Sequence, residues 1–377
     1  MKQELHLISF DVPFPPNYGG VVDVYYKIKA LHAKGVGVHL HCFEYGRGEQ
    51  EELNKICSSV SYYRRDENKL NFLKSEPYIV ASRANADLLD RLKQDHLPII
   101  IEGLHNCWII DSLKPSDRQI FVRTHNVEHD YYNGLAKVEK SLTKRQYFKW
   151  EAAKLEKYEE ILTKADGLFS ISPNDQDYFN EKYGNATLLP AFHSGEKVTT
   201  SIGKGDFALY HGNMAVGENV EAATFLIEEV FAHKPEYYLI IAGSNPPPEL
   251  LQLASQFKNV EMRANISVEH LEQLIADAHV NVLPTFQPTG IKLKMLSALY
   301  KGRFALVNNE MVENTGLESL CSVANTPQEW MKELDRLFSL SFEEVDLNKR
   351  KDILSKHFDN LVNVDVIIEK VGVLIKA

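Results

Sequence analysis

Short apolar runs alternate with helical segments along most of the chain, and this alternation restricts its fold more than any other feature. The first run, Leu5–Phe10, leads into a loop that contains Gly19 and Gly20, and helical spacing follows over Val21–Lys34. Strands that alternate with helices form parallel sheets, because a parallel neighbour needs a crossover connection. The sequence therefore predicts an α/β protein of Rossmann-like organisation.

The alternation occurs twice, which predicts two domains. Expected strands lie at residues 5–10, 36–43, 59–63, 98–102, 119–123 and 167–172, and then at 207–211, 237–242, 259–262, 279–283 and 304–308. Residues 189–205 between the two sets have linker composition. We expect one domain over residues 1–190, a second over 206–350, and a helical region over 351–377 that kinks near Asp359. A chain of 377 residues also exceeds what one hydrophobic core normally serves.

Charge and composition exclude several classes of protein. The formal net charge of −10 argues against a general nucleic-acid binder, and the first loop lacks the Gly-x-Gly-x-x-Gly motif of nicotinamide cofactor sites. No apolar segment is long enough to span a bilayer, and we see no signal peptide. The four cysteines are scattered, which is typical of reduced, buried thiols. We therefore expect a cytoplasmic protein.

The stretch from Pro284 to Gly302 combines a strand end, a loop and the start of a helix. Gly290 allows close approach of the backbone to a ligand, and Lys292 and Lys294 add two cations where the helix begins. Helix N-termini bind phosphate, and lysines are disfavoured there unless an anion compensates them. The pattern fits a phosphate site, and it fits a solvated basic turn equally well.

Other loops at the predicted strand ends have similar chemistry. In the second half they are 211–215, 242–246 and 262–265, which are rich in glycine and asparagine. Such loops suit a nucleoside diphosphate, because they offer N–H donors and close backbone approach. In the first half the corresponding loops are 17–20, 102–105 and 123–129.

Taken together, these motifs resemble the retaining glycosyltransferases of the GT-B fold, within glycosyltransferase family 4. The resemblance covers nearly the whole chain and implies two Rossmann-like domains facing across a cleft, with a C-terminal helix that crosses back to the first domain. It implies donor-binding residues at Gly20, Gly212, Asn213, Gly243, Ser244, Asn265, Ile266, Thr289, Gly290, Ile291 and Ser297. It also implies acceptor-binding residues at Asn17, Tyr18, Gly19 and His105, and it places His125 near the donor sugar.

The resemblance implies transfer of a sugar from a UDP- or GDP-linked donor to a glycan or lipid-linked acceptor, with retention and without a cofactor. Two glutamates that bracket the last loop in many members are replaced by Thr289 and Ser297, which puts binding of the ribose in doubt. The usual basic residues after the first glycine turn are also missing. Neutralisation of the diphosphate is therefore expected from Lys292, Lys294 and backbone N–H groups, which lower the barrier electrostatically. We expect His125 to orient the sugar, and a structural cap at the strand end is its alternative role.

Three other functions remain open from the sequence. A nucleotide-sugar-binding protein that has lost turnover fits the missing glutamates, and an epimerase of the same fold is possible. His125, Glu128 and His129 also match the His-x-x-Glu-His pattern of some zinc peptidases. The hypothesis of a zinc hydrolase requires both histidines on one helix, with Glu128 as the base.

Residues 140–150 mix cations with aromatic side chains. This pattern is typical of a helix with one solvated face, and it also fits a contact with an anionic membrane surface. A lipid-linked acceptor would make such a contact useful, at the inner face of the membrane.

Overall fold

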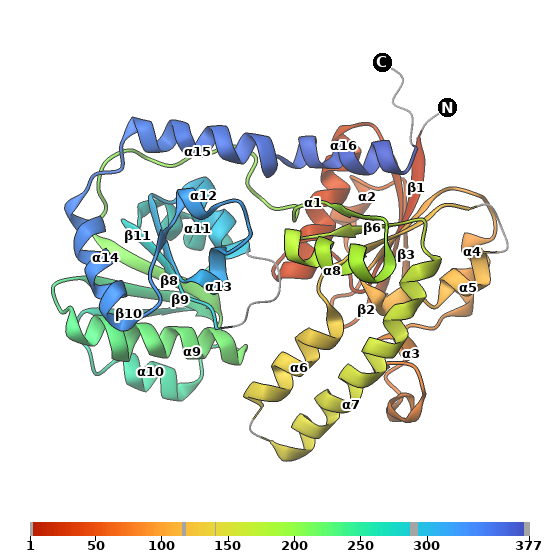
Figure 1. The fold of residues 1–377 in the computed structure, drawn as a ribbon, viewed down its shortest axis with the longest axis horizontal. Coiled ribbons are helices and arrows are strands. Elements are labelled where there is room, and N and C mark those ends of the chain that lie inside the picture. Colours follow the sequence, from red (N-terminus) through yellow and green to blue (C-terminus); the bar gives the residue numbers. More distant parts are fainter. Residues whose placement is uncertain (1–2, 115–117, 140, 287–292, 373–377) are drawn as a thin grey trace. The chain divides into compact units, whose positions relative to one another are not determined.

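The computed structural model describes residues 3–114, 118–139, 141–286 and 293–372 (Figure 1). These residues divide into two compact units. The described parts of 1–193 and 357–377 form the first unit, and those of 194–288 and 292–356 form the second.

The first unit contains a parallel sheet of seven strands in the order β3-β2-β1-β4-β5-β6-β7. Its strands are β1 (Glu4–Ser9), β2 (Gly37–Glu44), β3 (Ser59–Arg64), β4 (Ile99–Glu102), β5 (Ile120–Thr124), β6 (Gly167–Ser170) and β7 (Ala186–Leu188). In register, Leu7 of β1 lies opposite Leu40 of β2 and Ile100 of β4. The strand order reverses between β1 and β4, and ligands of such sheets bind outside the carboxyl ends of the strands at this point.

Helices cover both faces of the first sheet, which explains why its strands read as continuous apolar runs. The helices are α1 (Gly19–Ala33), α2 (Glu51–Asn54), α3 (Tyr78–Ala81), α4 (Ala86–Leu92), α5 (Ile109–Leu113), α6 (Glu128–Val138), α7 (Leu142–Tyr158), α8 (Pro173–Tyr183) and α16 (Asn360–Lys370). Successive side chains of a strand point to opposite faces. Leu7 accordingly packs in one apolar cluster with α1 and α16, and Ile8 packs in a second cluster on the other face.

The C-terminal helix α16 belongs to the first unit, where it packs against α1. Helix α15 (Glu344–His357) ends before it, and Asp359 caps α16 by accepting hydrogen bonds from the backbone N–H groups of Leu361 and Val362. The break coincides with the kink expected near Asp359. The change of unit falls at 357, six residues after the expected boundary at 351.

The second unit contains a parallel sheet of six strands in the order β10-β9-β8-β11-β12-β13. Its strands are β8 (Phe207–Asn213), β9 (Tyr238–Ser244), β10 (Val260–Ala264), β11 (Val280–Leu283), β12 (Phe304–Val307) and β13 (Ser322–Val323). The order reverses between β8 and β11, so the carboxyl ends of these two strands define the ligand-binding edge of this sheet.

The second unit also contains α9 (Gly217–Phe225), α10 (Pro248–Ala254), α11 (Val268–Asp277), α12 (Leu293–Lys301), α13 (Asn309–Val312), α14 (Pro327–Ser339) and most of α15. Helix α14 was not expected from the sequence, although Thr326 and Glu329 form a capping box at its start. In the described part of the chain, no helix combines the length and the apolar character needed to cross a membrane.

Candidate active site

Lys294 lies in the first turn of α12, and its side chain reaches back to the carboxyl end of β8. The ammonium group donates to the side-chain oxygen of Asn219 and lies 3.4 Å from the Tyr210 hydroxyl oxygen. It also lies 5.1 Å from the centroid of the Tyr210 ring. The lysine charge is therefore held at the point where the strand order of the second sheet reverses.

Two of the predicted donor-binding glycines lie opposite each other on neighbouring strands, close to this lysine. Gly212 of β8 pairs with Gly243 of β9, and a Cβ at Gly243 would lie 2.1 Å from the Gly212 carbonyl oxygen. A Cβ at Gly212 would lie 3.0 Å from the Lys294 Nζ. Gly243 is restricted to glycine by the close approach of the backbone, whereas a Cβ at Gly212 would press only on the side chains of Asn219 and Lys294.

The next predicted residues form a connected rim at the ends of β8, β9 and β10. Asn213 pairs with Ser244, and the backbone N–H of Asn245 donates to the Asn265 side chain at 2.9 Å. Asn245 and Asn265 both adopt positive φ, at 52° and 55°, which asparagine tolerates better than most residues. The structure thus brings Gly212, Asn213, Gly243, Ser244 and Asn265 together. Ile266 follows Asn265 and packs against the adjacent apolar cluster.

His211 lies below the rim and is buried. Burial, followed by the charge of Lys294, lowers the pKa of His211 to about 3, so the imidazole is neutral at physiological pH. Its Nε2 atom has no hydrogen-bond partner among the described residues. His211 was expected only as part of the loop at residues 211–215 and not as a site residue.

The end of β11 is fixed by side chains that the sequence analysis did not single out. The Asn308 side chain accepts from the Thr285 backbone N–H at 3.0 Å and donates to the Thr285 carbonyl oxygen at 2.6 Å. The Thr285 hydroxyl donates to Glu218 at the start of α9. Ser297 lies half-buried on α12, one turn after Lys294.

The remaining predicted residues of this loop, Lys292, Thr289, Gly290 and Ile291, lie outside the described residues.

In the first unit, the loop between β1 and α1 is held by two charged side chains. The Tyr18 hydroxyl donates to Asp11 at 2.6 Å, and Arg47 donates to the Pro15 carbonyl oxygen at 2.7 Å and to the Asn17 side chain. The guanidinium also lies over the Tyr18 ring, 5.0 Å from its centroid. The predicted acceptor-binding residues Asn17 and Tyr18 are thereby fixed in one loop.

Gly19 and Gly20 begin α1 directly after this loop. A Cβ at Gly20 would lie 2.5 Å from the tip of the Phe10 ring, so glycine is required there for helix and strand to approach. The same ring stacks on His105, with 4.9 Å between the ring centroids, and meets His125 edge-on at 5.4 Å. Phe10 therefore joins three of the predicted site positions of the first unit.

His125 is held by one ring nitrogen and leaves the other without a partner. Its Nε2 lies 2.8 Å from Glu102 Oε2, and its buried Nδ1 has no partner among the described residues. A carboxylate only accepts hydrogen bonds, so the Nε2 atom carries a proton. The Nδ1 atom is then an acceptor when the ring is neutral and a donor when it is charged.

Glu102 belongs to a buried network of charged groups. Lys27 contacts Glu102 at 2.7 Å and Asp23 at 2.9 Å, and Arg123 contacts Asp23 at 3.0 Å. Burial alone would raise the pKa of Glu102, but Lys27 and the hydrogen bond to His125 outweigh it and hold the pKa below its usual value. Glu102 is therefore a carboxylate at neutral pH, and it fixes the orientation of His125.

His105 lies at the end of β4, beside the positive-φ residue Gly103. Burial, followed by the nearby charge of Arg83, holds the pKa of His105 well below its usual value. Its Nδ1 has no partner among the described residues. His105 is therefore a neutral imidazole, which can accept a hydrogen bond from a hydroxyl group.

The geometry does not supply what the zinc alternative requires. Helix α6 begins at Glu128, so His125 precedes the helix and does not share one helical face with His129. His125 faces Glu102, and the Nδ1 of His129 lies 3.5 Å from Glu159. The two histidines therefore serve different carboxylates.

The described residues contain one cluster of potential metal ligands, formed by Asp23, Glu102 and His125. Lys27 and Arg123 already contact the carboxylates of this cluster. These two positive charges already neutralise the carboxylates that a metal ion would need as ligands. The cluster therefore fits a buried salt-bridge network better than a metal site.

Sequence reasoning missed Asp23, Lys27, Tyr210 and Asn219, which orient the predicted site residues. A signal for the first two was present, because Asp23 and Lys27 are four residues apart in a helix whose neighbouring positions Val24, Ile28 and Leu31 are apolar. No comparable signal existed for Tyr210, since its role depends on the path of the Lys294 side chain.

The sequence of the second unit matches a known family. Residues 206–339 match the family model described as glycosyl transferases group 1. A curated relative, named an uncharacterized 44.6 kDa protein in the cps region of Klebsiella pneumoniae, is 24% identical over 328 residues. That match covers 82% of this chain and 84% of the relative.

Solved structures resemble the whole chain at low sequence identity. A glycosyltransferase from Rickettsia africae has a TM-score of 0.68 at 12% identity, and the match covers 98% of each chain. TarM has a TM-score of 0.67 at 10% identity, with 99% of each chain covered. The trehalose-6-phosphate synthase OtsA has a TM-score of 0.67 at 12% identity, covering 99% of this chain and 100% of that one. The predicted GT-B fold of two Rossmann-like domains is thereby confirmed, and so is the resemblance to group 1 glycosyltransferases.

Proposed function

We propose that this chain, with its GT-B fold and its group 1 glycosyltransferase domain, transfers a sugar from a nucleoside diphosphate to a glycan or lipid-linked acceptor. The family match and the fold support sugar transfer as the reaction class. Retention of the anomeric configuration, independence of a metal ion, and UDP or GDP as the nucleotide are the finer parts of the proposal.

The position of Lys294 carries this proposal. Cleavage of a glycosyl–phosphate bond leaves negative charge on the departing diphosphate, and a fixed cation beside it lowers the barrier. Tyr210 and Asn219 hold the Lys294 ammonium at the carboxyl end of β8, where ligands of such sheets bind. The rim of Gly212, Gly243 and Asn265 supplies backbone close to the same point.

On the sugar side, we assign a positioning role to His125. Glu102 fixes its Nε2 and leaves the Nδ1 to bind a hydroxyl or carbonyl group of the donor sugar. In a retaining reaction of this kind the acceptor attacks from the face that the diphosphate leaves. Departing phosphate oxygens can then take the acceptor proton, so no side chain of the protein is required as a base.

The acceptor and the setting are further parts of the proposal. Asn17, Tyr18 and His105 lie in the two loops that end β1 and β4, where an acceptor hydroxyl has polar partners available. The curated relative is named for a cps region, which supports polysaccharide biosynthesis. We expect the protein to act in the cytoplasm.

The direct test replaces Lys294 and follows both binding and transfer. We expect Lys294→Ala to abolish transfer and to reduce the thermal shift given by UDP or GDP, whichever stabilises the unmodified protein. Lys301→Ala on the same helix is the matched control, because Lys301 pairs with Glu272 at the far end of α12. Wild-type turnover in Lys294→Ala would refute the proposal.

A second candidate function is binding of a nucleotide sugar without turnover. The observation that favours it is Ser297 on α12, which occupies the position where the resemblance to family 4 implies a ribose-binding glutamate. A neutral hydrogen bond contributes about 1 kcal/mol, against roughly 1.5–3 kcal/mol for one to a charged group. Donor hydrolysis, or transfer to any acceptor, by the purified protein would exclude this candidate.

A further inference from the structure

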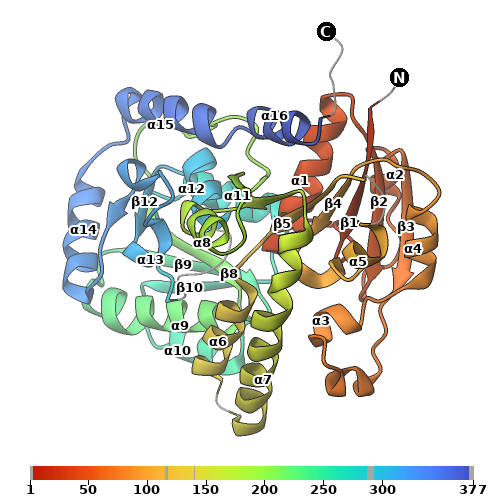
Figure 2. The ribbon, with the colours of Figure 1, turned by 45° about the vertical axis from the view of Figure 1, so that its right-hand side comes forward.

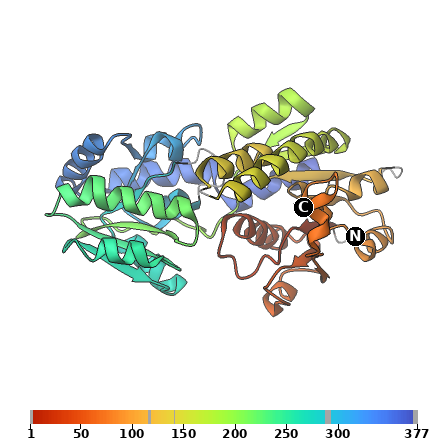
Figure 3. The ribbon, with the colours of Figure 1, turned by 90° about the horizontal axis from the view of Figure 1, so that it is seen from below.

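Helices α6 and α7 form a hairpin that extends beyond the strands of the first sheet (Figure 2). The two helices pack side by side, as Figure 3 also shows, and Tyr132 of α6 meets Phe148 of α7 with 6.0 Å between ring centroids. Phe72 packs against Tyr147, which lies between Arg145 and Lys149 on α7. Tyr132 also packs against an apolar cluster of the first sheet, so the hairpin is tied to the first unit by aromatic contacts.

The hairpin is basic between residues 133 and 150, although the chain as a whole is acidic. Residues 133–150 contain five basic residues and one acidic residue, which gives +4 against −10 for the whole chain. The basic residues are Lys137, Lys140, Lys144, Arg145 and Lys149, and the acidic residue is Glu139. Such a concentration of one sign creates a local field that attracts anionic surfaces.

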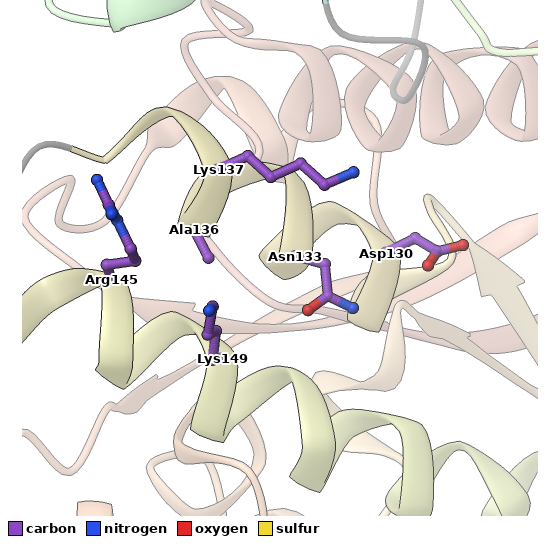
Figure 4. A pocket seen from close by; sticks show the side chains of 6 residues that line it. All are labelled: Asp130, Asn133, Ala136, Lys137, Arg145 and Lys149. Atoms are coloured by element: carbon purple, nitrogen blue, oxygen red, sulfur yellow. The ribbon is translucent and has the colours of Figure 1, made fainter. Parts of the chain in front are cut away.

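Three of these cations surround a hollow between the two helices (Figure 4). The hollow has a volume of about 510 Å³ and is lined by Lys137, Arg145, Lys149, Asp130, Asn133 and Ala136. Two donor nitrogens of Arg145 bond to the Glu139 carbonyl oxygen at 3.1 and 2.8 Å, which fixes the guanidinium. Cations for a phosphate and acceptor groups for hydroxyls therefore lie in one hollow.

Two large apolar side chains of α7 are also exposed. Leu142 is 75% exposed and Trp150 is 43% exposed. Successive residues of a helix are rotated by about 100°, so Leu142, Lys149 and Trp150 fall on one side of α7. One surface of the hairpin thus combines cations with unburied apolar groups.

We propose that this surface, the basic side of the α6–α7 hairpin, binds the headgroups of an anionic phospholipid bilayer. Lys137, Arg145 and Lys149 bind the lipid phosphate, and Asp130 and Asn133 accept hydroxyls of a polyol headgroup. Leu142 and Trp150 enter the interfacial layer, where leucine and tryptophan are favoured. A soluble polyanion would satisfy the cations but would leave both apolar groups in water, so the bilayer fits the surface better.

The test is co-sedimentation of the full-length chain with vesicles. We expect binding to vesicles of phosphatidylcholine mixed with phosphatidylglycerol, little binding to phosphatidylcholine alone, and weakening as salt is raised. No donor or acceptor is needed, so the result is separate from that of sugar transfer. Equal binding to both vesicle types, or none to either, would overturn the proposal.

Two variants separate the parts of the surface. The first variant combines Lys137→Gln with Lys149→Gln and keeps Arg145, because Arg145 holds the connection between the helices. Each lost cation should weaken binding to the mixed vesicles roughly fivefold, so we expect a loss of about 30-fold for the pair. Leu142→Ser with Trp150→Ser should also weaken it while leaving the charge unchanged. The control is Lys258→Gln with Lys332→Gln, which removes two exposed cations of the second unit and should bind as the unmodified chain does.

Two results would contradict the assignment of this surface. One is an equal loss of binding in the control pair, since it would show attraction by overall charge. The other result has two parts. Soluble poly-glutamate would bind the unmodified chain but not the variant that lacks Lys137 and Lys149, and the Leu142→Ser, Trp150→Ser variant would keep full binding to vesicles. That pattern would identify an acidic polymer as the ligand.

Discussion

His125 is held through Nε2 by Glu102 and leaves Nδ1 buried without a partner among the described residues. An unpaired buried polar atom costs free energy in the folded protein, and such atoms persist where a ligand completes them. At the scale of single residues, His125 and His129 differ in what surrounds this atom. The Nδ1 of His129, four residues later, also lacks a hydrogen bond, but it lies 3.5 Å from the Glu159 carboxylate, and its Nε2 lies 3.7 Å from Asp130.

The two histidines should therefore respond differently to replacement. We expect His125→Ala to lower the rate of transfer by about 100-fold, the size found when one fixed polar contact to a reacting group is removed. His129→Ala should leave the rate within a few-fold and instead lower the melting temperature. Steady-state kinetics and thermal unfolding of both variants are the measurements. Equal loss of activity in both would revive a shared role such as the zinc reading.

Gly243 provides a second test at this scale, because its environment has no room for a side chain. A Cβ there would lie 2.1 Å from the Gly212 carbonyl oxygen, so we expect Gly243→Ala to destabilise the protein by about 1–3 kcal/mol and to weaken nucleotide binding. Gly217→Ala is the control, since nothing lies within 4 Å of a Cβ at that helix start. Nucleotide binding that survives Gly243→Ala unchanged would remove this rim from the proposed site.

At the scale of elements, α1 is the helix that connects the site of the first unit to its core. Its apolar side packs on the sheet through Val24, Ile28 and Leu31. Asp23 and Lys27 on the same helix are buried and reach Arg123 of β5 and Glu102 of β4. The helix therefore sets the position of Glu102, and through it the orientation of His125.

Removal of one charge from this network should cost far more than removal of an exposed one. We expect Lys27→Ala to destabilise the chain by about 3–5 kcal/mol, because it leaves buried carboxylates without their cation. Lys29→Ala, an exposed neighbour on the same helix, should change stability by less than about 1 kcal/mol. Denaturant unfolding of both variants makes the comparison, and similar stabilities would show that the network is not coupled to folding.

Most strands and helices were predictable from the sequence, because parallel strands covered on both faces have continuous apolar sequences. Strands β7 and β13 were missed since they are short edge strands of three and two residues. Glycine positions of the rim were predictable from close approach. The partners of Lys294 were not, because the position of a long side chain depends on tertiary packing that no local pattern records.

At the scale of the whole molecule, both units contain histidines that are kept neutral by burial. Burial lowers the pKa of His6 and of His193 to about 4, and burial with the charge of Lys294 lowers that of His211 to about 3. His6 bonds to His41 at 2.8 Å on the first sheet, and burial lowers the pKa of His41 as well. His129 shifts the other way, because its hydrogen bond with Glu159 raises its pKa.

This distribution predicts how stability depends on pH. A histidine whose pKa is lower in the folded state takes up protons more readily when unfolded, so its contribution is complete above about pH 6.5 and falls as the pH decreases towards 4. For His6 alone the loss is roughly 3 kcal/mol, at about 1.4 kcal/mol for each unit of pKa. Two groups oppose this loss on acidification: His129, and Glu128, whose pKa burial raises to about 7. More groups contribute to the loss, because the pKa values of His41, His193 and His211 are lowered as well as that of His6. We therefore expect the unfolding free energy to fall steadily between pH 6.5 and 4.

Calorimetry of the full chain from pH 7.5 to 4.5 measures this dependence, and a variant identifies its source. His6→Asn removes the titrating ring that lies between His41 and Asp95, so the variant should be less stable at pH 7.5 but should lose less stability on acidification. His32→Asn is the control, because His32 is an exposed histidine on α1. If the slope against pH is the same in His6→Asn and in the unmodified chain, His6 is not its source, and the acid sensitivity belongs to other buried imidazoles such as those of His193 and His211. Asp95 does not contribute in this range, since a carboxylate held below its usual pKa loses its contribution only at lower pH than a buried histidine does.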